Sequence, residues 1–149
     1  MKINYKDHPL KIFAAYIGRH KKMFFIDMGC AVAVSAIDLI FPYVSRLSMN
    51  ELLPKNLFGT FFAVMAIMLL AYVLKAALYY VITYVGHHMG VLTESDMRQD
   101  LFNHMQELSF SFFDQNRTGV LLSRVTSDLF DITELAHHGP ENILICSLT

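Results

Sequence analysis

The chain has 149 residues, of which 54% are hydrophobic and 17% are charged, and its formal net charge is -1 at pH 7. The hydrophobic residues lie in long blocks rather than scattered, which excludes an ordinary small soluble domain with a polar surface. Basic residues and aromatic residues do not alternate in any patch, so nucleic acid is excluded as a partner.

The N-terminal segment, residues 1–22, is basic. It contains one acid, Asp7, and six basic residues: Lys2, Lys6, Lys11, Arg19, Lys21 and Lys22. Asp7 and Pro9 suit the start of a helix, because Asp can cap the first turn and Pro is tolerated within it. We expect a short helix lying in the membrane interface, with Lys6, Lys11 and Arg19 reaching phosphate head groups. A solvated basic tail is the alternative.

Two apolar blocks follow, and each is long enough to cross a bilayer. A hydrocarbon core about 30 Å thick needs about 20 apolar residues. The first span lies in residues 23–48. The second block, residues 57–108, combines a span from Leu57 to Val85 with a cytoplasmic extension, and a short outer loop, Asn50 to Asn56, joins the two blocks. The second block contains no Pro, and as one helix it extends roughly 78 Å, well beyond the bilayer. The excess of basic residues before the first block predicts a multi-pass protein of the plasma membrane with a cytoplasmic N-terminus.

The regular pattern ends after Leu108. Before that point Met97, Leu101, Met105 and Leu108 form one apolar stripe of a helix. Residues 109–125 are rich in turn-forming residues, and Asp128 suits the first turn of a third helix over residues 126–149. The sequence therefore predicts an all-α membrane protein with a helix, a reversal containing a small helical insert, and a returning helix that has only begun to re-enter the membrane.

The same region carries a family pattern. It reads Gly90-x5-Asp96-x-Arg98, Leu101-Phe102, Phe112-Phe113-Asp114, Gly119, Ser123-Arg124 and Asp128, in order and correctly spaced. This resembles the first intracellular loop of ATP-binding-cassette (ABC) exporters of type 1. The resemblance implies the N-terminal part of an exporter transmembrane domain: an elbow helix (1–22), two long transmembrane helices extending into the cytoplasm, a coupling-helix reversal (109–125) and the start of a third long helix.

In ABC exporters the short helix of this loop docks onto the nucleotide-binding domains and transmits their closure to the membrane helices. Carried over by position, the coupling residues are Asp114, Arg117, Gly119, Leu121, Leu122, Arg124 and Asp128. Gly119 would permit a close backbone approach, and Arg124 would pair with Asp128 or with an acid of the partner. The alternative is that Gly119 and Arg124 only shape and solvate the loop tip.

No phosphate-binding loop and no Ser-His-acid pattern occurs in the sequence, so no catalytic, cofactor-binding or metal-binding residue is assigned. The resemblance implies that ATP and Mg bind a nucleotide-binding domain in a longer polypeptide or a separate chain. It also implies a homo- or heterodimeric transporter that is an ATPase as a whole. The rival hypothesis is a small membrane-anchored interaction or sensor module whose cytoplasmic hairpin binds another protein.

Three charged residues lie within the expected spans, Met23 to Val44 and Leu57 to Val85: Asp27, Asp38 and Lys75. Ionisable residues are costly in a bilayer and are functional candidates by default. Matching depths across the outer loop places Lys75 opposite Cys30, about one helical turn from Asp27. We therefore expect an intramembrane Asp27–Lys75 pair. Asp38 either lines a water-filled translocation path or meets a helix outside this sequence.

Two histidine pairs, His87-His88 and His137-His138, lie at similar distances from the reversal. Antiparallel helices would bring them to one height, but adjacent helical residues point about 100° apart, so each pair offers one ring in a given direction. Polar residues at the interface are therefore preferred to a metal or pH-sensing site. Cys30 and Cys146 lie in apolar surroundings and are expected to be buried thiols rather than a disulfide.

Overall fold

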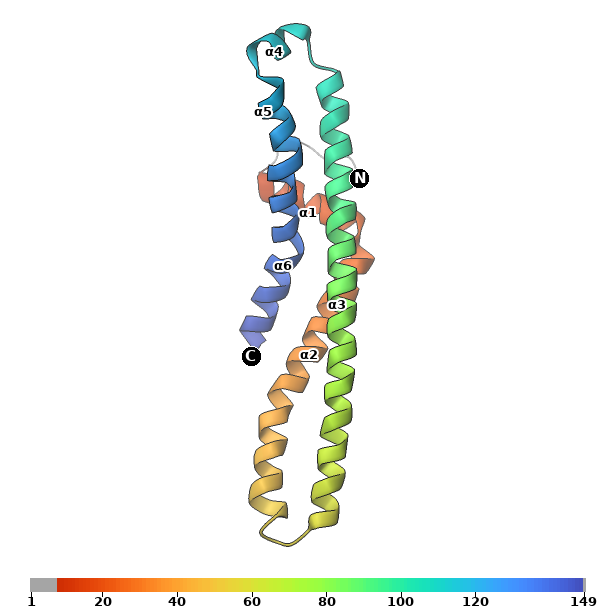
Figure 1. The fold of residues 1–149 in the computed structure, drawn as a ribbon, viewed down its shortest axis with the longest axis vertical. Coiled ribbons are helices and arrows are strands. Elements are labelled where there is room, and N and C mark those ends of the chain that lie inside the picture. The colour runs from red at the N-terminus through yellow and green to blue at the C-terminus, as the bar shows by residue number, and fades with distance from the viewer. Residues whose placement is uncertain (1–7, 149) are drawn as a thin grey trace. The chain divides into compact units, whose positions relative to one another are not determined.

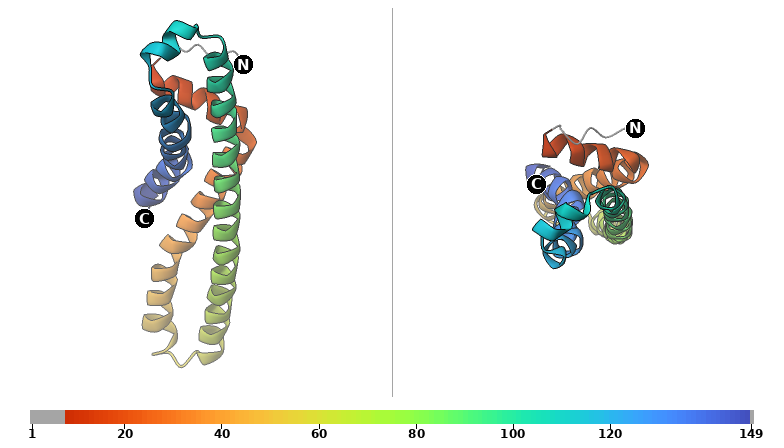
Figure 2. Two further views of the ribbon diagram at one scale, coloured as in Figure 1. Left: turned by 45° about the horizontal axis from the view of Figure 1, so that its top comes forward. Right: turned by 90° about the horizontal axis from the view of Figure 1, so that it is seen from above.

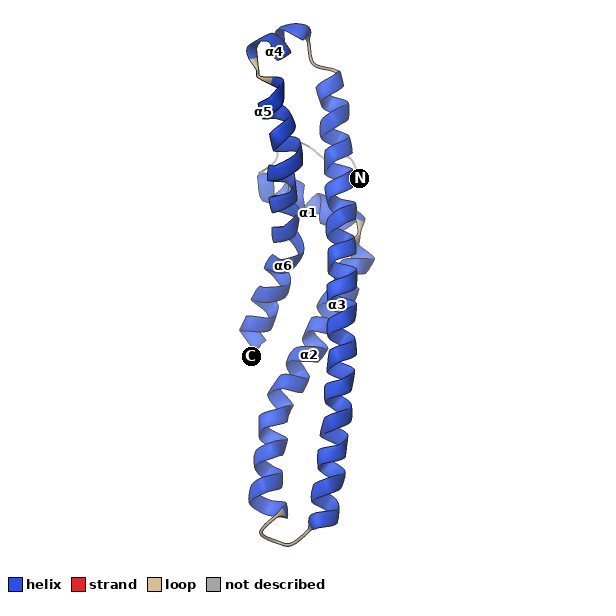
Figure 3. Ribbon diagram, viewed as in Figure 1, coloured by secondary structure: helices blue, strands red, loops and turns tan. Residues whose placement is uncertain are grey.

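The computed structural model describes residues 8–148, without the side chains of residues 136, 137, 141 and 148. Every regular element in this described part is helical, and none is a strand (Figure 3). The elements are α1 (Pro9–Arg19), α2 (Lys21–Leu47), the π-helical turn η1 (Ser48–Leu52), α3 (Phe58–Gln106), α4 (Phe110–Gln115), α5 (Thr118–Ser123), the π-helical turn η2 (Arg124–Asp128) and α6 (Leu129–Leu148). The predicted all-α fold class is confirmed.

Helix α1 begins with a cap that the sequence did not suggest. The His8 side chain accepts a hydrogen bond from the backbone N–H of Leu10 at 3.4 Å through Nδ1, and Pro9 occupies the first helical position. Proline suits this position because its missing N–H would have no partner inside the helix. Asp7, the expected cap, lies outside the described residues, as do Lys2 and Lys6.

Two of the described helical segments are long and apolar enough to cross a membrane: Lys21–Leu52 with 32 residues and Phe58–Gln106 with 49. The first keeps Pro42 inside α2 and continues through η1. The second is a single α-helix that passes through His88 without interruption. The connection between them contains Asn56, whose φ of 56° lies in the left-handed region that Asn adopts more readily than most residues.

The chain divides into two compact units. One unit comprises Ile26–Tyr84 and Glu141–Thr149. Its core is formed by the fully buried side chains of Ala31, Val34 and Ile82, and partly buried apolar residues pack against them: Cys30, Leu78, Leu144 and Ile145. Apolar residues of α3 in this unit, such as Leu69 and Leu70, remain exposed. This pattern is typical of a helix whose surroundings are lipid or further helices.

The other unit comprises Met1–Phe25 and Val85–Pro140. Here α1 lies crosswise to the parts of α3 and α6 that belong to this unit (Figure 2). Buried Met89 and Thr93 lie one turn apart on α3, and Leu129 and Thr133 are buried one turn apart on α6. Thr133 satisfies its hydroxyl within α6 by donating to the carbonyl of Phe130 at 2.9 Å. Small polar side chains of this kind allow close helix packing without leaving a polar atom unpaired.

The reversal contains two short helices where the sequence predicted one small insert (Figure 1). Helix α4 ends at Gln115. The next residue, Asn116, caps it, and its side-chain amide donates to the carbonyl of Phe112 at 2.8 Å. Arg117 then adopts an extended backbone conformation and precedes α5. From Thr118 onward α5, η2 and α6 follow one another without a break, so the returning helix begins earlier than the expected residue 126.

Candidate functional site

The expected coupling residues lie on α4, α5, η2 and the connection between the two short helices. Leu121 is half-buried. The other six residues are exposed: Asp114, Arg117, Gly119, Leu122, Arg124 and Asp128. Exposed residues of this kind remain available to a partner. The predicted set thus lies within the short stretch from Asp114 to Asp128, most of which is exposed.

Apolar residues are exposed on this stretch and just before it. Phe110, the first residue of α4, is 91% exposed, and Leu122 of α5 is 59% exposed. Val120 is exposed as well. Large apolar side chains grouped on a surface commonly mark a contact with another protein or with lipid. Phe110 is not among the predicted coupling residues, although its spacing from Phe113, three residues further on, places both rings on one face of a helical turn.

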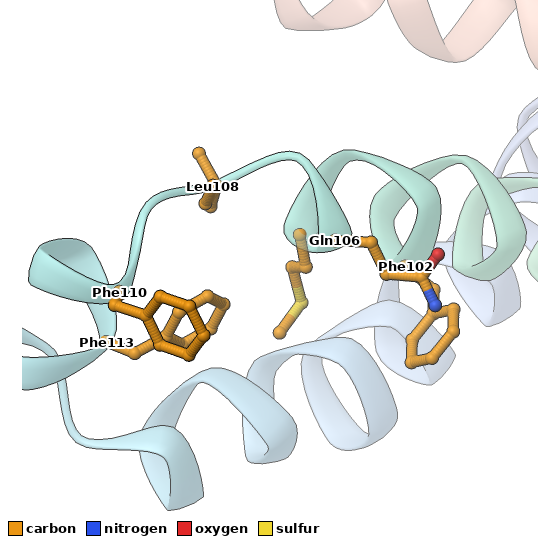
Figure 4. Close-up of a pocket in the computed structure, with 6 residues that line it drawn as sticks. Phe102, Gln106, Leu108, Phe110 and Phe113 are labelled. Carbon is orange, nitrogen blue, oxygen red and sulfur yellow. The ribbon is translucent and has the colours of Figure 1, made fainter.

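A cavity of about 400 Å³ lies at the tip of the reversal, by which we mean α4, α5 and the connection between them. Its lining is predominantly apolar and comes from the end of α3, the connection and α4: Phe102, Met105, Gln106, Leu108, Phe110 and Phe113. Figure 4 shows Phe110 and Phe113 of α4 among the side chains that line this cavity. The stripe predicted on α3 therefore continues into this cavity through Met105 and Leu108.

The structure describes the surroundings of two single residues of the reversal, Gly119 and Arg124. Gly119 is helical, and a methyl group at its Cα would meet no atom of the described chain within 4 Å. A close backbone approach at Gly119 therefore concerns only a partner. Arg124 and Asp128 form no salt bridge in the described part of the chain. They bound η2, whose i→i+5 hydrogen bonding alters the register that a plain α-helix would give them.

The charged residues within the spans pair differently from the prediction. Lys75 of α3 forms a salt bridge with Asp38 of α2, not with Asp27. The Lys75 ammonium also lies over two aromatic rings, 5.3 Å from the centroid of Tyr72 and 5.7 Å from that of Tyr79. Cation–π contacts of this type add to the stabilisation of a charge held away from water. Asp38 thereby has a partner within this chain.

The position of the turn explains the corrected pairing. Asp38 faces Lys75 and Phe41 faces Tyr72, with ring centroids 4.8 Å apart for the aromatic pair. In both contacts the two residues lie equally far along the chain from a point near Asn56, which is therefore the middle of the turn. The turn lies this late because η1 prolongs the first helical segment to Leu52. When the middle of the turn shifts by a given number of residues, the residue that faces Lys75 shifts by twice that number, from Cys30 to Asp38. Asp27 lies nearer the start of α2, further from the turn than Asp38, and is fully buried.

The histidines meet as their spacing predicted. The rings of His87 and His138 contact each other edge to face, with centroids 5.6 Å apart. Among the described side chains, no group of three or more His, Cys, Asp or Glu residues could hold a metal ion. The His137 side chain lies outside the described part. Cys30 is half-buried, whereas Cys146 is exposed, which corrects the expectation of a buried thiol.

Arg19 was expected to reach phosphate head groups, but its guanidinium binds acids of α3 instead. It lies 3.3 Å from Asp96 Oδ2 and 3.1 Å from Asp100 Oδ2. Burial alone would lower the pKa of Arg19, but the hydrogen bonds to Asp96 and Asp100 outweigh it, so this pKa lies above its ordinary value. Arg19 is thus held in the charged state on α3.

Comparison with known proteins gives one family. Residues 24–141 match the ABC transporter transmembrane region. This range includes both apolar segments, the reversal and the first part of α6. No solved structure gives a significant match.

Several curated proteins are similar to this chain. The ABC transporter ATP-binding protein YwjA of Bacillus subtilis is 41% identical over 140 residues, covering 94% of this chain and 24% of that protein. An ATP-dependent lipid A-core flippase of Idiomarina loihiensis is 29% identical over 134 residues, covering 87% and 22%. A flippase of the same name from Syntrophus aciditrophicus is 28% identical over 114 residues, covering 76% and 19%.

The chain therefore spans about a quarter of the length of the first of these relatives. The match to the family extends over most of the chain, and the fold is the helical, apolar one that a membrane region requires. The chain belongs to the family of ABC transporter transmembrane regions.

Proposed function

We propose that this chain supplies the first membrane helices of an ATP-driven exporter, and that α4 and α5 couple movements of the nucleotide-binding domains to substrate translocation. The observation that carries the proposal is that the reversal between α3 and α6 exposes the apolar residues Phe110, Val120 and Leu122. The names of two similar proteins, both ATP-dependent flippases, support export as the direction of transport.

The tip suits docking for a physical reason. Full burial of one large apolar side chain stabilises a contact by about 1.5–3 kcal/mol, and several such residues lie close together in sequence here. Helix α3 leads to this tip as one uninterrupted helix. A helix transmits a rigid-body movement, whereas a flexible loop would absorb it.

The exporter also needs partners for this chain and a defined orientation of the chain in the membrane. The nucleotide-binding domain, with its ATP and Mg, lies in the rest of a longer polypeptide or on a separate chain. A second transporter half completes the dimer, and lipid surrounds the spans. The N-terminus and the tip lie on the cytoplasmic side of the plasma membrane, in agreement with the basic residues before α2.

Cysteine cross-linking in the full-length transporter tests the docking. The change Leu122→Cys, combined with single cysteines across the nucleotide-binding domain, should give a short-range cross-link to that domain. Lys55→Cys in the connection between α2 and α3 is the matched control and should give none. If Leu122→Cys cross-links no better than Lys55→Cys, the coupling function is wrong.

A second variant measures what the contact does. Leu122→Asp places a charge in the proposed contact and should reduce ATP-dependent transport about tenfold or more, the factor expected when the burial of one leucine is lost. Gln115→Asp, at an exposed polar position of α4, should leave transport within about twofold. Equal effects of the two changes would contradict a specific role of Leu122.

A further inference from the structure

Helix α1 is joined to α3 by a group of polar side chains that we call the α1–α3 cluster: Tyr16, Arg19, His20, Asp96 and Asp100. The Tyr16 hydroxyl donates to Asp100 Oδ2 at 2.8 Å, and the Arg19 guanidinium donates to the same oxygen at 3.1 Å. Arg19 also lies 3.3 Å from Asp96 Oδ2, and His20 Nε2 lies 3.3 Å from that oxygen. Two carboxylates of α3 thus receive three side chains from the end of α1 and the residue after it.

The spacing of the residues makes this arrangement specific. Asp96 and Asp100 are one turn apart on α3, so their carboxylates point the same way. The Arg19 guanidinium spans both and lies over the Tyr16 ring, 4.7 Å from its centroid. Tyr16 is only 2% exposed, so the cluster is built around a buried side chain rather than on open surface. Networks of this kind contribute more to stability than isolated ion pairs on the surface.

Apolar packing between the two helices is incomplete by comparison. A cavity of about 390 Å³ lies beside the cluster, lined by Ile12, Tyr16, Met97, Asp100, Leu101 and His104. A second cavity of about 340 Å³ is lined by residues of α1, α3 and α6 and shares Ile12 and Met97 with the first. Loosely packed apolar surfaces do not fix one register, because they forfeit contacts whichever way they slide. The polar cluster, by contrast, joins α1 to α3 through defined hydrogen bonds and ion pairs.

We propose that Asp96 and Asp100 are positioning residues that keep α1 fixed to the C-terminal part of α3, so that the two move as one piece when the transporter changes state. This inference rests on the proposed function in one respect, since it assigns the movement to the transport cycle. It gives Arg19 a protein partner instead of a lipid phosphate. Helix α1 then follows α3, rather than remaining in place as an independent membrane anchor.

The test uses the full-length transporter with spin labels on α1 and α3. The labels are placed by Gly18→Cys and Gln99→Cys in a background in which Cys30, Cys146 and any other cysteines are replaced. Both positions are exposed, and a Cβ at Gly18 would meet no atom of the described chain within 4 Å. We expect a single narrow distance distribution that is the same without nucleotide and in the ATP-trapped state.

Charge exchange then tests the cluster itself. Arg19→Glu alone and Asp100→Arg alone should broaden the distribution and slow ATP-dependent transport about two- to fivefold, because the charged side chains around Tyr16 remain partly exposed and water screens them. The double variant Arg19→Glu with Asp100→Arg should restore part of both the distribution and the rate, because one ion pair forms again while Asp96 repels the new carboxylate at position 19. Tyr16→Phe removes one hydroxyl and should cause a smaller change of the same kind, in a protein that still folds.

Lys11→Glu is the matched control, because Lys11 is exposed on the same helix. If Lys11→Glu and Arg19→Glu act equally, α1 is held by lipid and the inference is wrong. A distance that changes with nucleotide in the unmodified cluster, or a double variant that restores nothing, also overturns it. The distance measurement does not depend on docking at Leu122, so failure of the coupling function appears in the Leu122 cross-link while the charge-exchange result stands.

Discussion

Asp38 and Lys75 form a charged contact in segments whose other residues are mostly apolar. The pair is largely shielded, with the Lys75 side chain 18% exposed and the Asp38 side chain 28% exposed. Each charge relieves the cost of holding the other away from water. Losing one partner is therefore more harmful than losing both.

This asymmetry gives a prediction. Lys75→Leu or Asp38→Leu alone should destabilise the full-length transporter by about 1–3 kcal/mol, because one charge is left without its counter-ion. The double variant Asp38→Leu with Lys75→Leu should regain most of that loss. Thermal unfolding in detergent, followed by the amount of monodisperse protein, measures both effects.

The pair formed by Glu51 and Lys55 provides the control. Both side chains are more than half exposed and lie four residues apart near the connection between α2 and α3. Exposed pairs contribute about 0–1 kcal/mol, so Glu51→Gln should change the unfolding temperature little. A loss as large as that of Asp38→Leu would show that the intramembrane pair has no special importance.

At this scale the sequence identified the charged residues but not their partners. Asp38 and Lys75 were recognisable because ionisable residues are rare in apolar segments. Their pairing was missed because it depends on η1 and on the position of the turn, which hydropathy does not encode. The partner of Arg19 was missed for a related reason. The one-turn spacing of Asp96 and Asp100 was visible, but nothing in the sequence indicated that α1 lies against that face of α3.

The helices are the elements that the sequence predicted best. The Pro-free run of residues 57–108 is observed as α3, Phe58–Gln106, because no residue within it interrupts the backbone hydrogen bonds. The two short helices of the reversal were less predictable. Their separation at Asn116 and Arg117 depends on a side-chain hydrogen bond and two extended residues rather than on a breaker such as Pro.

Continuity of α3 should matter for function. Gln99→Pro at an exposed position removes one backbone hydrogen bond, clashes with the preceding turn and should cost about 3 kcal/mol or more. ATP-dependent transport should fall, since the helix would no longer pass movement along its length. Gln99→Ala at the same position should leave both stability and transport nearly unchanged. Similar transport by the two variants would contradict transmission through a continuous helix.

The molecule as a whole should have a defined orientation in the membrane. We expect Lys55→Cys, in the connection between α2 and α3, to react with a membrane-impermeant thiol reagent added to intact cells. Ser111→Cys on α4 should react only after the cells are opened. The basic N-terminal segment favours a cytoplasmic N-terminus, and two spans later α4 lies on the same side of the membrane. Labelling of both positions in intact cells would refute this orientation.

The turn η2 has a consequence for comparing this protein with its relatives. A single π-helical turn inside an α-helical segment is what the insertion of one residue leaves behind. A homologue with an unbroken α-helix here should be one residue shorter between α5 and α6. Without that gap, an alignment would pair each residue of α6 with a neighbour rotated by about 100° around the helix axis. Side chains that share an ancestral role would then be assigned to the wrong face.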